Sequence, residues 1–597
     1  MATVNFIDTP ENVQDAIDWI ITQDAVGFDT ETNSLDPLAS KVLLMQIGTP
    51  SRQYVFDVAK IGKRKVKQIL DAINKDKMMK ILHNSIFDYM HIKSNFGIEL
   101  NNMKCTMLAE QLLNQGKKNV GFSLDAVVKK YLGISLDKST REEFQHHKFG
   151  SSFTEEQILY SAKDVEHIIP VYNNVQKLLN ERGMEQLSLL EYETAGVLGN
   201  MTLDGIYLDK ELWIPLVDKA QIGLKKAQEK LDEHFKYYID ANEAVDLFGA
   251  VEHAINYNSP KQLLPRLKEV TRLEIASTDA KYLEFYKDKH PVIADLIDYR
   301  QEQKKISTYG LAFLENIHKF DNRIHSKYRQ LKAQTGRISS DDPNMMNLPK
   351  SQDYRTPFCV QDQSWNFISA DFSGQELRLL AHASQEPQMI KALKDGVDLH
   401  TYSASLLFEK DYDAITKDER GQCKAITFAL LYGAGPKKLS EKLKIPYSDA
   451  RALMNRYFAV FTKVKKFMDE IVTRVELEHY ALSPLDGRRV DMSETDWDNK
   501  ASVAHAINQA KNLPFQGAGA STTKLALVRL NNRIRKNGYH AKIVNSIHDE
   551  ILIEVAPEHT EEVKLAAEEE MIKAFNIYAD SVPMEVNPKV GKHWIKD

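Results

Sequence analysis

The sequence predicts a multidomain protein that combines α/β and α+β architecture. Its 597 residues suggest about four structural units, because a typical domain has roughly 150 residues. Short apolar runs alternate with longer polar–apolar periodic segments up to about residue 190, which is typical of an α/β domain. Farther along, a long helical stretch lies between strand-like segments at 364–371 and 541–555, which indicates an α+β region.

Composition and charge narrow the class of protein. Hydrophobic residues make up 43% and charged residues 27%, which excludes collagen-like, low-complexity and mainly disordered chains. The net charge is 78 − 84 = −6, so the chain lacks the broad positive surface of a protein that coats nucleic acid, although a local cleft could still hold DNA. The cysteines, Cys105, Cys359 and Cys423, are far apart and form neither a zinc pattern nor a disulfide framework.

The sequence contains no recognisable targeting or membrane signal. No run of eighteen apolar residues occurs, so we expect no membrane span. The N-terminal segment MATVNFIDTPENVQDAIDW has neither a basic nor an apolar region, unlike a secretory signal. These features predict a cytoplasmic protein that does not associate with membranes.

The N-terminal part has readable strands and one well-marked helix. AVGFDTET and KVLLMQIGT are predicted strands, and KMMKILHN is a predicted strand that leads into a helix. FTEEQILYSAKDVEHI is a predicted helix in which Thr154 and Gln157 form a capping box. We expect Pro170 to end or kink this helix.

The remainder of the chain is helical around a few strands. Residues 191–320 have helical periodicity, with a break and a new helix start at NYNSPKQL (256–263). A polar loop (332–349) and the strand SWNFISAD follow, and then roughly 130 residues of helical pattern. AKIVNSIHDEILIEV is predicted to form two strands joined by a tight turn at His548 and Asp549. We expect this pair to join the strand ending at Asp371, so that the helical region is an insertion into one sheet.

Carboxylates in the N-terminal part form a pattern suited to metal binding. Asp29 and Glu31 are two apart on a strand and share a face, whereas Tyr160 and Asp164 are one turn apart on a helix. With Asp88, these acids could hold two Mg²⁺ or Mn²⁺ ions that activate water for phosphodiester cleavage. Unrelated surface acids would explain the D-x-E pair alone, but not the order of FDTE, HNSIFD and YSAKD.

In this order the three segments resemble a DEDD-type 3′–5′ exonuclease of the tyrosine-containing branch. The resemblance implies an RNase H-like domain at about residues 1–190. It also implies that Asp29, Glu31, Asp88 and Asp164 hold the metals and that Tyr160 assists the nucleophile. Cys105 stands where relatives often have Asp; because this position is not a metal ligand, we expect only local packing to differ.

The second part has two isolated acids and a cationic helix. Asp371 ends a predicted strand, and Asp549 lies at a predicted hairpin tip. Between them, one helix carries four side chains at intervals of four: Arg420, Lys424, Phe428 and Tyr432. Two cations one turn apart could bind a polyphosphate, and the aromatics could stack on a base or sugar. An amphipathic helix with buried aromatics is the simpler alternative for the helix taken alone. Gly433 and Gly435 are expected to stop it.

The segments DFSGQELR, RGQCKAITFALLYG and IHDE resemble motifs A, B and C of the family A, or polymerase I-like, DNA polymerases. Further similar segments are QTGRISSDDPNMMNLP, DLHTYSA, SPLDGRRV and NLPFQG. The resemblance implies a right-hand polymerase domain at 191–597, after the exonuclease. Its thumb would span about 195–320, its palm 321–405 with 530–597, and its fingers 406–529.

Residue roles follow from the resemblance. It implies that Asp371 and Asp549, with Glu550 nearby, bind two Mg²⁺ ions, and that Mn²⁺ could replace them. The triphosphate would contact His400, Arg420 and Lys424, and Lys424 could protonate the pyrophosphate. Phe428 and Tyr432 would line the nascent pair, with Phe428 disfavouring dideoxynucleotides, and Glu376 would exclude a ribose 2′-hydroxyl. The implied primer–template contacts are Arg337, Asn512, Gln516 and His548.

The implied function is template-directed DNA synthesis from dNTPs with 3′–5′ proofreading. We expect a monomer that binds primer–template DNA, with a helicase, primase, single-strand binding protein or processivity factor as further possible partners. A bacteriophage replicative enzyme is favoured, and bacterial or organellar origins stay open. Ile507, Asn508 and Ser521 depart from the residues common in relatives, which leaves their contacts undetermined. Two alternatives are a single-subunit RNA polymerase, disfavoured by Glu376 and the nuclease domain, and a non-catalytic DNA-binding scaffold, disfavoured by two intact carboxylate sets.

Overall fold

The computed structural model describes residues 3–75, 77–137, 141–236, 244–245, 251–252, 255–349, 351–431 and 433–595. The chain forms two compact units. Unit 1 comprises Met1–Gly205, Ser326–Met346 and Ser364–Gly591, and unit 2 comprises Ile206–His325, Asn347–Gln363 and Lys592–Asp597. In the part of the chain that is described, no helix is both long and apolar enough to cross a membrane.

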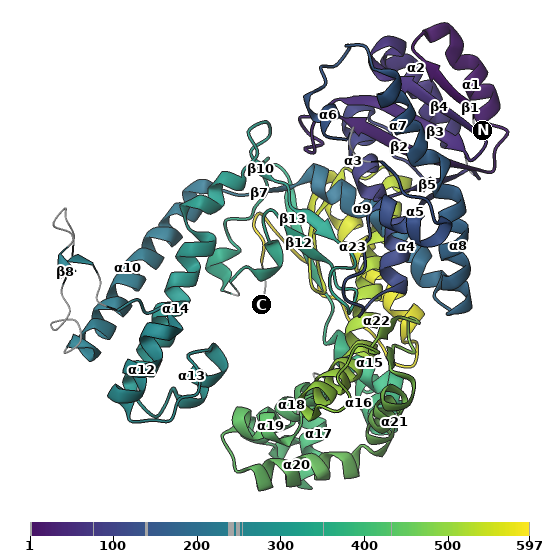
Figure 1. Ribbon diagram of the computed structural model, residues 1–597. Coiled ribbons are helices and arrows are strands. Elements are labelled where there is room, and N and C mark those ends of the chain that lie inside the picture. Colours follow the sequence, from purple (N-terminus) through teal and green to yellow (C-terminus); the bar gives the residue numbers. More distant parts are fainter. Residues whose placement is uncertain are drawn as a thin grey trace. The chain divides into compact units, whose positions relative to one another are not determined.

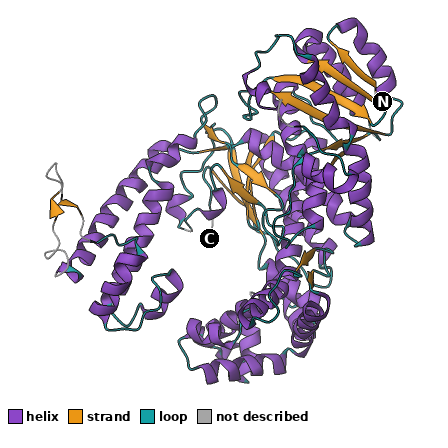
Figure 2. Ribbon diagram, viewed as in Figure 1, coloured by secondary structure: helices purple, strands orange, loops and turns teal. Residues whose placement is uncertain are grey.

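The N-terminal part of unit 1 is built on a six-stranded mixed sheet (Figures 1 and 2). Its strands, in the spatial order β1-β4-β3-β2-β5-β6, are β1 Thr3–Ile7, β4 Arg52–Asp57, β3 Val42–Thr49, β2 Ala25–Thr32, β5 Met79–Leu82 and β6 Met103–Cys105. β2 pairs antiparallel with β3 and parallel with β5. The predicted strands AVGFDTET and KVLLMQIGT are therefore confirmed, as is the strand at KMMKILHN.

Helices surround this sheet. They are α1 Val13–Ile20, α2 Val58–Ile73, α3 Ser85–Phe96, α4 Thr106–Leu113, α5 Leu124–Leu132, α6 Arg141–His146, α7 Glu155–Glu166, α8 Ile168–Glu181 and α9 Glu185–Asp204. The capping box of Thr154 and Gln157 at the start of α7 is confirmed, with bonds of 3.1 and 3.2 Å. The expected break is present: α7 stops at Glu166, whose carbonyl a continuing helix would pair with the N–H that Pro170 lacks. Pro170 itself lies in the first turn of α8, where no N–H is needed.

A second sheet in unit 1 joins strands that are far apart in sequence. The strands are β16 Ala541–Ile547, β17 Glu550–Val555, β13 Asn366–Asp371 and β18 Lys589–Gly591, in that order and all antiparallel. Asp371 pairs with Glu550 in the register of β13 and β17. The predicted hairpin and its pairing with the strand ending at Asp371 are thus confirmed. Two shorter strands, β11 Lys327–Arg329 and β12 Ser339–Asp341, form a separate hairpin.

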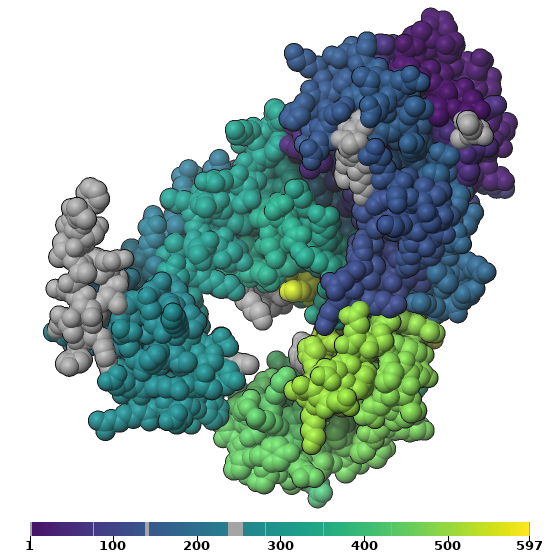
Figure 3. Space-filling model, viewed as in Figure 1, coloured from purple at the N-terminus to yellow at the C-terminus, as the bar shows by residue number. Residues whose placement is uncertain are grey.

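Between β13 and β16 the chain is mostly helical, as predicted. The helices are α15 Gln375–Ser384, α16 Pro387–Lys394, α17 Leu399–Phe408, α18 Lys417–Leu431, α19 Pro436–Leu443, α20 Tyr447–Val460, α21 Thr462–Glu478 and α22 Lys500–Asn537. The space-filling view shows α17 to α21 as a continuous green surface (Figure 3). The small hairpin of β14 Tyr480–Leu482 and β15 Arg489–Asp491 precedes α22, and α23 Thr560–Tyr578 packs on α22.

α22 is the longest helix that the structure describes, with 38 residues. It continues through Pro514 without a recorded break, and it packs against α9, α15, α21 and α23. The predicted fingers–palm boundary at 529/530 falls inside this helix. One rigid element therefore connects the segment NLPFQG to the region before β16.

Unit 2 has its own apolar core between long helices. Its helices are α10 Lys210–His234, α12 Pro260–Thr271, α13 Ala280–Tyr286 and α14 Pro291–Tyr309, and its short strands are β7 Ile206–Tyr207, β8 Ala244–Val245, β9 Val251–Glu252 and β10 Arg323–Ile324. α10 and α14 lie side by side, and Trp213 is fully buried among Phe313, Tyr354 and Phe358. The predicted helix start in NYNSPKQL is confirmed by Ser259, the N-cap of α12.

Candidate active sites

The first carboxylate cluster lies where β2 meets α7. Asp29 and Glu31 are on one face of β2, and Asp164 comes from α7. A Cβ added at Gly27 would lie 2.7 Å from Ile168 Cγ2 and 2.8 Å from the Val165 carbonyl oxygen, so the missing side chain lets the helices approach the strand. One ligand oxygen from each of Asp29, Glu31 and Asp164 lies within 4.8 Å of the others. A set of oxygen donors at this spacing fits a hard divalent cation.

Asp88 belongs to the same region but is held differently. It is buried on α3 and accepts a hydrogen bond of 2.7 Å from Thr30 Oγ1, which comes from the residue between Asp29 and Glu31. Burial raises the pKa of Asp88 to about 7, with a further contribution from Asp164, although the Thr30 bond opposes the rise. The structure thus brings three of the four predicted acids into one cluster and places the fourth beside it.

Two other sequence expectations concern this region. Tyr160 lies one turn before Asp164 on α7, with its ring centroid 6.1 Å from that of Phe144. Cys105 is fully buried at the end of β6, where its Sγ accepts from the Ser85 backbone N–H at 3.5 Å. The departure at Cys105 therefore concerns packing, as expected.

The second pair of acids lies at the end of the second sheet. Asp371 is the last residue of β13, and Asp549 is in the turn between β16 and β17. His548 has φ 58°, a left-handed conformation that closes this tight turn. The backbone N–H of Phe372 donates to the Asp549 carbonyl at 3.4 Å, so the two acids come from adjacent backbone. Residues 178 positions apart along the chain, 371 and 549, are therefore neighbours in the fold.

Glu550, the third predicted acid, is buried. It pairs in register with Asp371, and its carboxylate accepts a hydrogen bond from Ser369 Oγ on β13. Ser369 and Asp371 are two apart on one strand, so Glu550 lies on the same face of the sheet as Asp371. The hydrogen bond fixes the direction of the Glu550 carboxylate.

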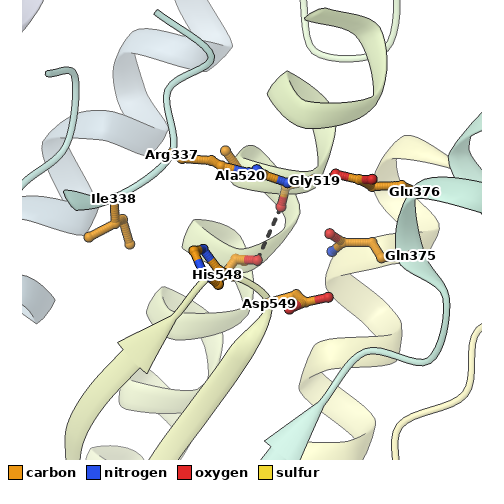
Figure 4. Close-up of a pocket in the computed structure, with 9 residues that line it drawn as sticks. Arg337, Ile338, Gln375, Glu376, Gly519, Ala520, His548 and Asp549 are labelled. Atoms are coloured by element: carbon orange, nitrogen blue, oxygen red, sulfur yellow. Dashed lines mark hydrogen bonds and ion pairs between the residues drawn. The ribbon is translucent and has the colours of Figure 1, made fainter. Parts of the chain in front are cut away.

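A small pocket opens beside Asp549. It is lined by Arg337, Ile338, Gln375, Glu376, Gly519, Ala520, Thr523, His548 and Asp549, most of which Figure 4 labels. Arg337 pairs with Glu376 at 2.6 Å, which holds the carboxylate of Glu376 at the pocket. A Cβ on Gly519 would be 2.8 Å from Gln375 Oε1, so the glycine lets α15 pack closely on α22. Three of the predicted nucleotide or DNA contacts, Arg337, Glu376 and His548, thus share a pocket with a predicted metal ligand.

The remaining predicted DNA contacts are on α22. Asn512 and Gln516 are one helical turn apart and lie on the face that continues to Ala520 and Thr523, which line the pocket. Both side chains are partly exposed. The Asn512 amide oxygen is buried without a hydrogen-bond partner in the described chain, which leaves it able to accept one.

Two residues on α22 that differ from those common in relatives, Asn508 and Ser521, contact other segments of the fold. Ser521 is buried and donates to Asp486 Oδ2 at 2.7 Å, and Arg488 donates to Ser521 at 3.4 Å. Asn508 lies against Gly433, where an added Cβ would be 2.8 Å from the Asn508 backbone. Ser521 therefore tethers the loop before β15 to α22, and Asn508 contacts the segment after α18. Ile507 is partly buried, and nothing further in the structure explains it.

The cationic stripe is present on α18, but its first cation is already paired. Arg420 binds Asp398 through two bonds of 2.9 and 3.0 Å, and Asp398 also caps α17 by accepting from Thr401. Although burial opposes the change, hydrogen bonds from Arg420 and Thr401 lower the pKa of Asp398 to about 2. Tyr432, the last member of the predicted stripe, lies outside the described residues.

His400, Lys424 and Phe428 lie together. The His400 and Phe428 ring centroids are 6.0 Å apart, and the Lys424 and Lys442 ammonium groups are each 5.9 Å from the Phe428 ring. Burial, together with the cations of Arg420 and Lys424, lowers the pKa of His400 to about 4, although Asp398 opposes the change. Its Nδ1 is buried with no hydrogen-bond partner in the described part of the chain. Near pH 7 the imidazole of His400 is therefore neutral.

Three residues that take part in these sites were not predicted: Thr30, Gln375 and Asp398. Thr30 could have been suspected from its place between Asp29 and Glu31. Asp398 begins the segment DLHT and stands directly before α17, which is the position of an N-cap residue. No sequence signal connects Asp398 with Arg420, which is 22 residues away.

The fold and the two sites define a class: a protein with two carboxylate centres, one beside a mixed sheet and one at the tip of a hairpin in a second sheet. A family model for DNA polymerase family A matches residues 224–596, and one for a 3′-5′ exonuclease matches residues 4–180. The chain belongs to family A of the DNA polymerases and carries a 3′–5′ exonuclease domain. It is a DNA-directed DNA polymerase with template-directed synthesis and proofreading, so the predicted family, fold class and enzyme activity are confirmed.

Relatives support this assignment. DNA polymerase I of Aquifex aeolicus is 30% identical over 622 residues, which cover 99% of each chain. DNA polymerase I of Borreliella burgdorferi is 31% identical, covering 98% of this chain and 64% of its own length. The thermostable DNA polymerase I of Thermus thermophilus is 30% identical, covering 78% of this chain and 54% of its own length. This chain thus spans all of one relative and about half to two thirds of the others.

A solved structure shares the fold. The POL domain of Pol1 from M. smegmatis, in a complex with DNA primer-template and dNTP, has a TM-score of 0.84 and 24% identity, with 99% of both chains covered. Polymerases of this family and exonuclease domains of this kind use divalent metal ions, and the acidic cluster of Asp29, Glu31 and Asp164 fits such ions.

Proposed function

We propose that Asp371 and Asp549 hold two divalent ions, Mg²⁺ with Mn²⁺ as a substitute, during addition of a deoxynucleotide to a primer 3′ end. The observation that carries this is the adjacency of the two acids at the end of the β13–β17 pair. Ions held there would supply charge for the attacking 3′-hydroxyl and the departing pyrophosphate. Glu550 assists by holding its carboxylate, which accepts from Ser369, on the same face as Asp371.

The incoming dNTP binds along α18. Lys424 and His400 contact the triphosphate, and Lys424 donates the proton that the pyrophosphate takes up. Arg420 contacts the triphosphate after exchanging its bond with Asp398 for one with phosphate, since a bidentate guanidinium grip suits both anions. Phe428, with Tyr432 one turn further along the sequence, lines the nascent pair and disfavours dideoxynucleotides.

Glu376 sets the sugar preference. Its carboxylate is held by Arg337 at 2.6 Å in the pocket beside Asp549. A side chain fixed in this way excludes a 2′-hydroxyl more strictly than a mobile one. Deoxynucleotides are therefore preferred over ribonucleotides, which also argues against the RNA polymerase alternative.

The primer–template lies against α22 and the Asp549 turn. Asn512, Gln516 and Arg337 offer donors to the minor groove, whose acceptors are similar for all correct base pairs. His548 contacts the primer end from the turn next to Asp549. Such contacts check the shape of a base pair without reading its sequence.

The nuclease site removes mismatched 3′ ends. Asp29, Glu31, Asp88 and Asp164 hold two divalent ions, and Tyr160 orients the attacking water. Three of these acids offer oxygens within 4.8 Å of one another, and Thr30 orients the fourth. Ions held there would supply hydroxide and stabilise the leaving oxygen.

Paired variants test both sites. Asp549→Ala should abolish primer extension while leaving excision of a mismatched 3′ end intact, and Asp29→Ala should do the reverse. Each variant is the control for the other, because each must retain the activity of the untouched site. Primer extension by Asp549→Ala near the level of the parent would overturn the assignment and revive the non-catalytic scaffold.

Other expectations remain proposals of the same kind. We assign the exonuclease to 1–190, the thumb to 195–320, the palm to 321–405 with 530–597, and the fingers to 406–529. Closure of α18 over a correct nucleotide would act as a lid. Monomeric state, cytoplasmic location, accessory replication proteins and a bacteriophage source stay predictions, and the relatives named above are bacterial. Extension of a long primed circle, with and without helicase or clamp proteins, measures the dependence on partners.

A further inference from the structure

A short hairpin in unit 2 brings together two histidines and an aspartate that the polymerase and nuclease sites do not use. The turn follows the short helix Leu311–Asn316 and ends in β10. Ile317 pairs with Ile324 across it, and the His318 N–H donates to the Arg323 carbonyl at 2.8 Å. The Asn322 N–H donates to the His318 carbonyl at 2.9 Å, and Asn322 has a left-handed backbone conformation with φ 60°. The backbone of this turn is thus closed by its own bonds.

Three side chains of the turn converge. His325 Nε2 is 3.0 and 3.1 Å from the two carboxylate oxygens of Asp321, and His318 Nδ1 is 3.9 Å from Asp321 Oδ1. One ligand atom from each residue lies within 4.8 Å of the other two. The imidazole rings of His318 and His325 are 5.4 Å apart at 80°, so they face the carboxylate from different directions.

These distances match the ligand spacing of a small metal ion. Ligands at about 2.0–2.1 Å from a tetrahedral zinc lie about 3.3 Å from each other. Asp321 is thus approached by one imidazole nitrogen at 3.0 Å and by a second at 3.9 Å. We propose that His318, Asp321 and His325 form a binding site for a divalent transition metal ion of the zinc type, with water in the remaining position.

The chemistry of the donors distinguishes this site from the catalytic ones. Imidazole nitrogens favour zinc, cobalt and copper, whereas carboxylate-only sites favour magnesium and manganese. The carboxylate is also oriented within the turn, because the Arg323 backbone N–H donates to Asp321 Oδ1 at 3.1 Å, and the Gln361 side chain fixes the backbone of Asp321 by donating to its carbonyl at 2.8 Å. Side-chain exposures of 22%, 36% and 10% for His318, Asp321 and His325 leave a path for the ion from solvent.

Another cluster provides a matched control. His540, Glu558 and His559 also have ligand atoms within 4.8 Å of one another. There, however, His559 Nδ1 already accepts the His540 backbone N–H at 3.2 Å, and the His540 side chain is 70% exposed. This cluster is therefore less prepared for a metal, and a variant at His559 removes an imidazole without touching the hairpin.

The test uses the full chain after chelator treatment, in excess Mg²⁺ to fill the oxygen sites. Co²⁺ is titrated while the visible absorption of four-coordinate Co²⁺ is recorded, and Zn²⁺ is then added as competitor. We expect the parent and His559→Ala to show the band, and His318→Ala and Asp321→Asn to bind Co²⁺ at least about tenfold more weakly. Added Zn²⁺ should raise the unfolding temperature of unit 2 in the parent and not in these two variants.

Several outcomes would overturn the proposal. In the first, the parent shows no Co²⁺ absorption band. In the second, the band is unchanged in both His318→Ala and Asp321→Asn. In the third, only His559→Ala loses the band. Unfolding curves without metal identify any variant that fails to fold. Asp321→Asn keeps the volume of the side chain and can still accept the Arg323 N–H, so it tests the metal if His318→Ala is unstable.

Discussion

A buried ionic cluster connects α9 with α22, and its removal gives a sharp stability prediction. Glu191 accepts from Lys524 Nζ at 2.6 and 2.8 Å, from Arg488 at 3.2 Å and from Gln330 at 2.9 Å. The side chains of Glu191, Lys524 and Arg488 are fully buried. Burial lowers the pKa of Lys524 to about 8, and Arg488 adds to this, whereas Glu191 opposes it. Glu191 and the buried Asp486, whose Oδ2 lies 3.5 Å from Arg488 Nε, therefore together offset two cations that water does not reach.

The perturbation is Glu191→Gln, which keeps the shape and removes the charge. Lys524 and Arg488 then remain buried with Asp486 as the nearest carboxylate. Removal of one partner of a buried pair costs about 3–5 kcal/mol. Unit 1 has roughly 450 residues, and at about 2.1 cal/mol/K per residue its midpoint shifts by about 1 °C per kcal/mol. The expected fall in the unfolding temperature is therefore about 3–5 °C.

The measurement is the unfolding midpoint of unit 1 by circular dichroism at pH 7, with Glu476→Gln as the matched control. Glu476 is exposed on α21, so the same chemical change there should shift the midpoint by less than about 1 °C. A double variant, Glu191→Gln with Lys524→Met, should lose less than the sum of the single losses, because the pair is coupled. A midpoint for Glu191→Gln equal to that of the surface control, or strict additivity, would refute the reasoning.

Three further predictions concern the active sites. Gly27→Val should reduce excision of a mismatched 3′ end about a hundredfold and spare primer extension, because the new side chain pushes α7 and Asp164 away from β2; equal excision by the variant and the parent would contradict it. The pKa of His400 is lowered from 6.5 in the unfolded chain to about 4 in the folded protein. Between these pH values the unfolded chain binds more protons than the folded protein. The free energy of unfolding therefore decreases as the pH falls from 6.5 toward 4. The unfolding temperature of His400→Gln should therefore fall less between pH 7 and pH 5 than that of the parent. An equal fall in both proteins would disprove the lowered pKa of His400. Thr154→Ala should lower the free energy of unfolding of the exonuclease part by about 1 kcal/mol, because the N-cap of α7 is lost. Denaturant unfolding measures this change. Thr560→Ser, which keeps a hydroxyl, is the reference variant.

The sequence predicted those features that depend on local pattern. The strand with Asp29 and Glu31, the capping box at Thr154 and the hairpin around Asp549 all have strong periodicity or turn chemistry, and all are confirmed. The pairing of β13 with β17 was predicted from strand-like segments on either side of the helical region, and it is confirmed. The role of each acid in catalysis stays a prediction, since geometry alone does not measure activity.

Features set by tertiary contact were not predictable. The bond between Arg420 and Asp398 joins two helices whose relative position follows from packing, so the stripe on α18 suggested an exposed cation that the fold instead pairs. The cluster of His318, Asp321 and His325 was missed although its members are three and four residues apart, because they lie in a turn rather than in a helix and meet only when that turn closes.

At both proposed catalytic centres, a glycine allows two elements of secondary structure to approach closely. Gly27 lets α7 contact β2, which places Asp164 beside Asp29, and Gly519 lets α15 contact α22, which places Gln375 and Glu376 at the pocket. At Gly27 the close neighbours are the Val165 carbonyl oxygen and Ile168 Cγ2, whereas at Gly519 the close neighbour is the amide end of Gln375. Because catalysis by positioned charge tolerates errors of only about 0.5 Å, we expect a side chain added at Gly27, where it would meet backbone, to disturb its site more than one added at Gly519, where the Gln375 side chain can move.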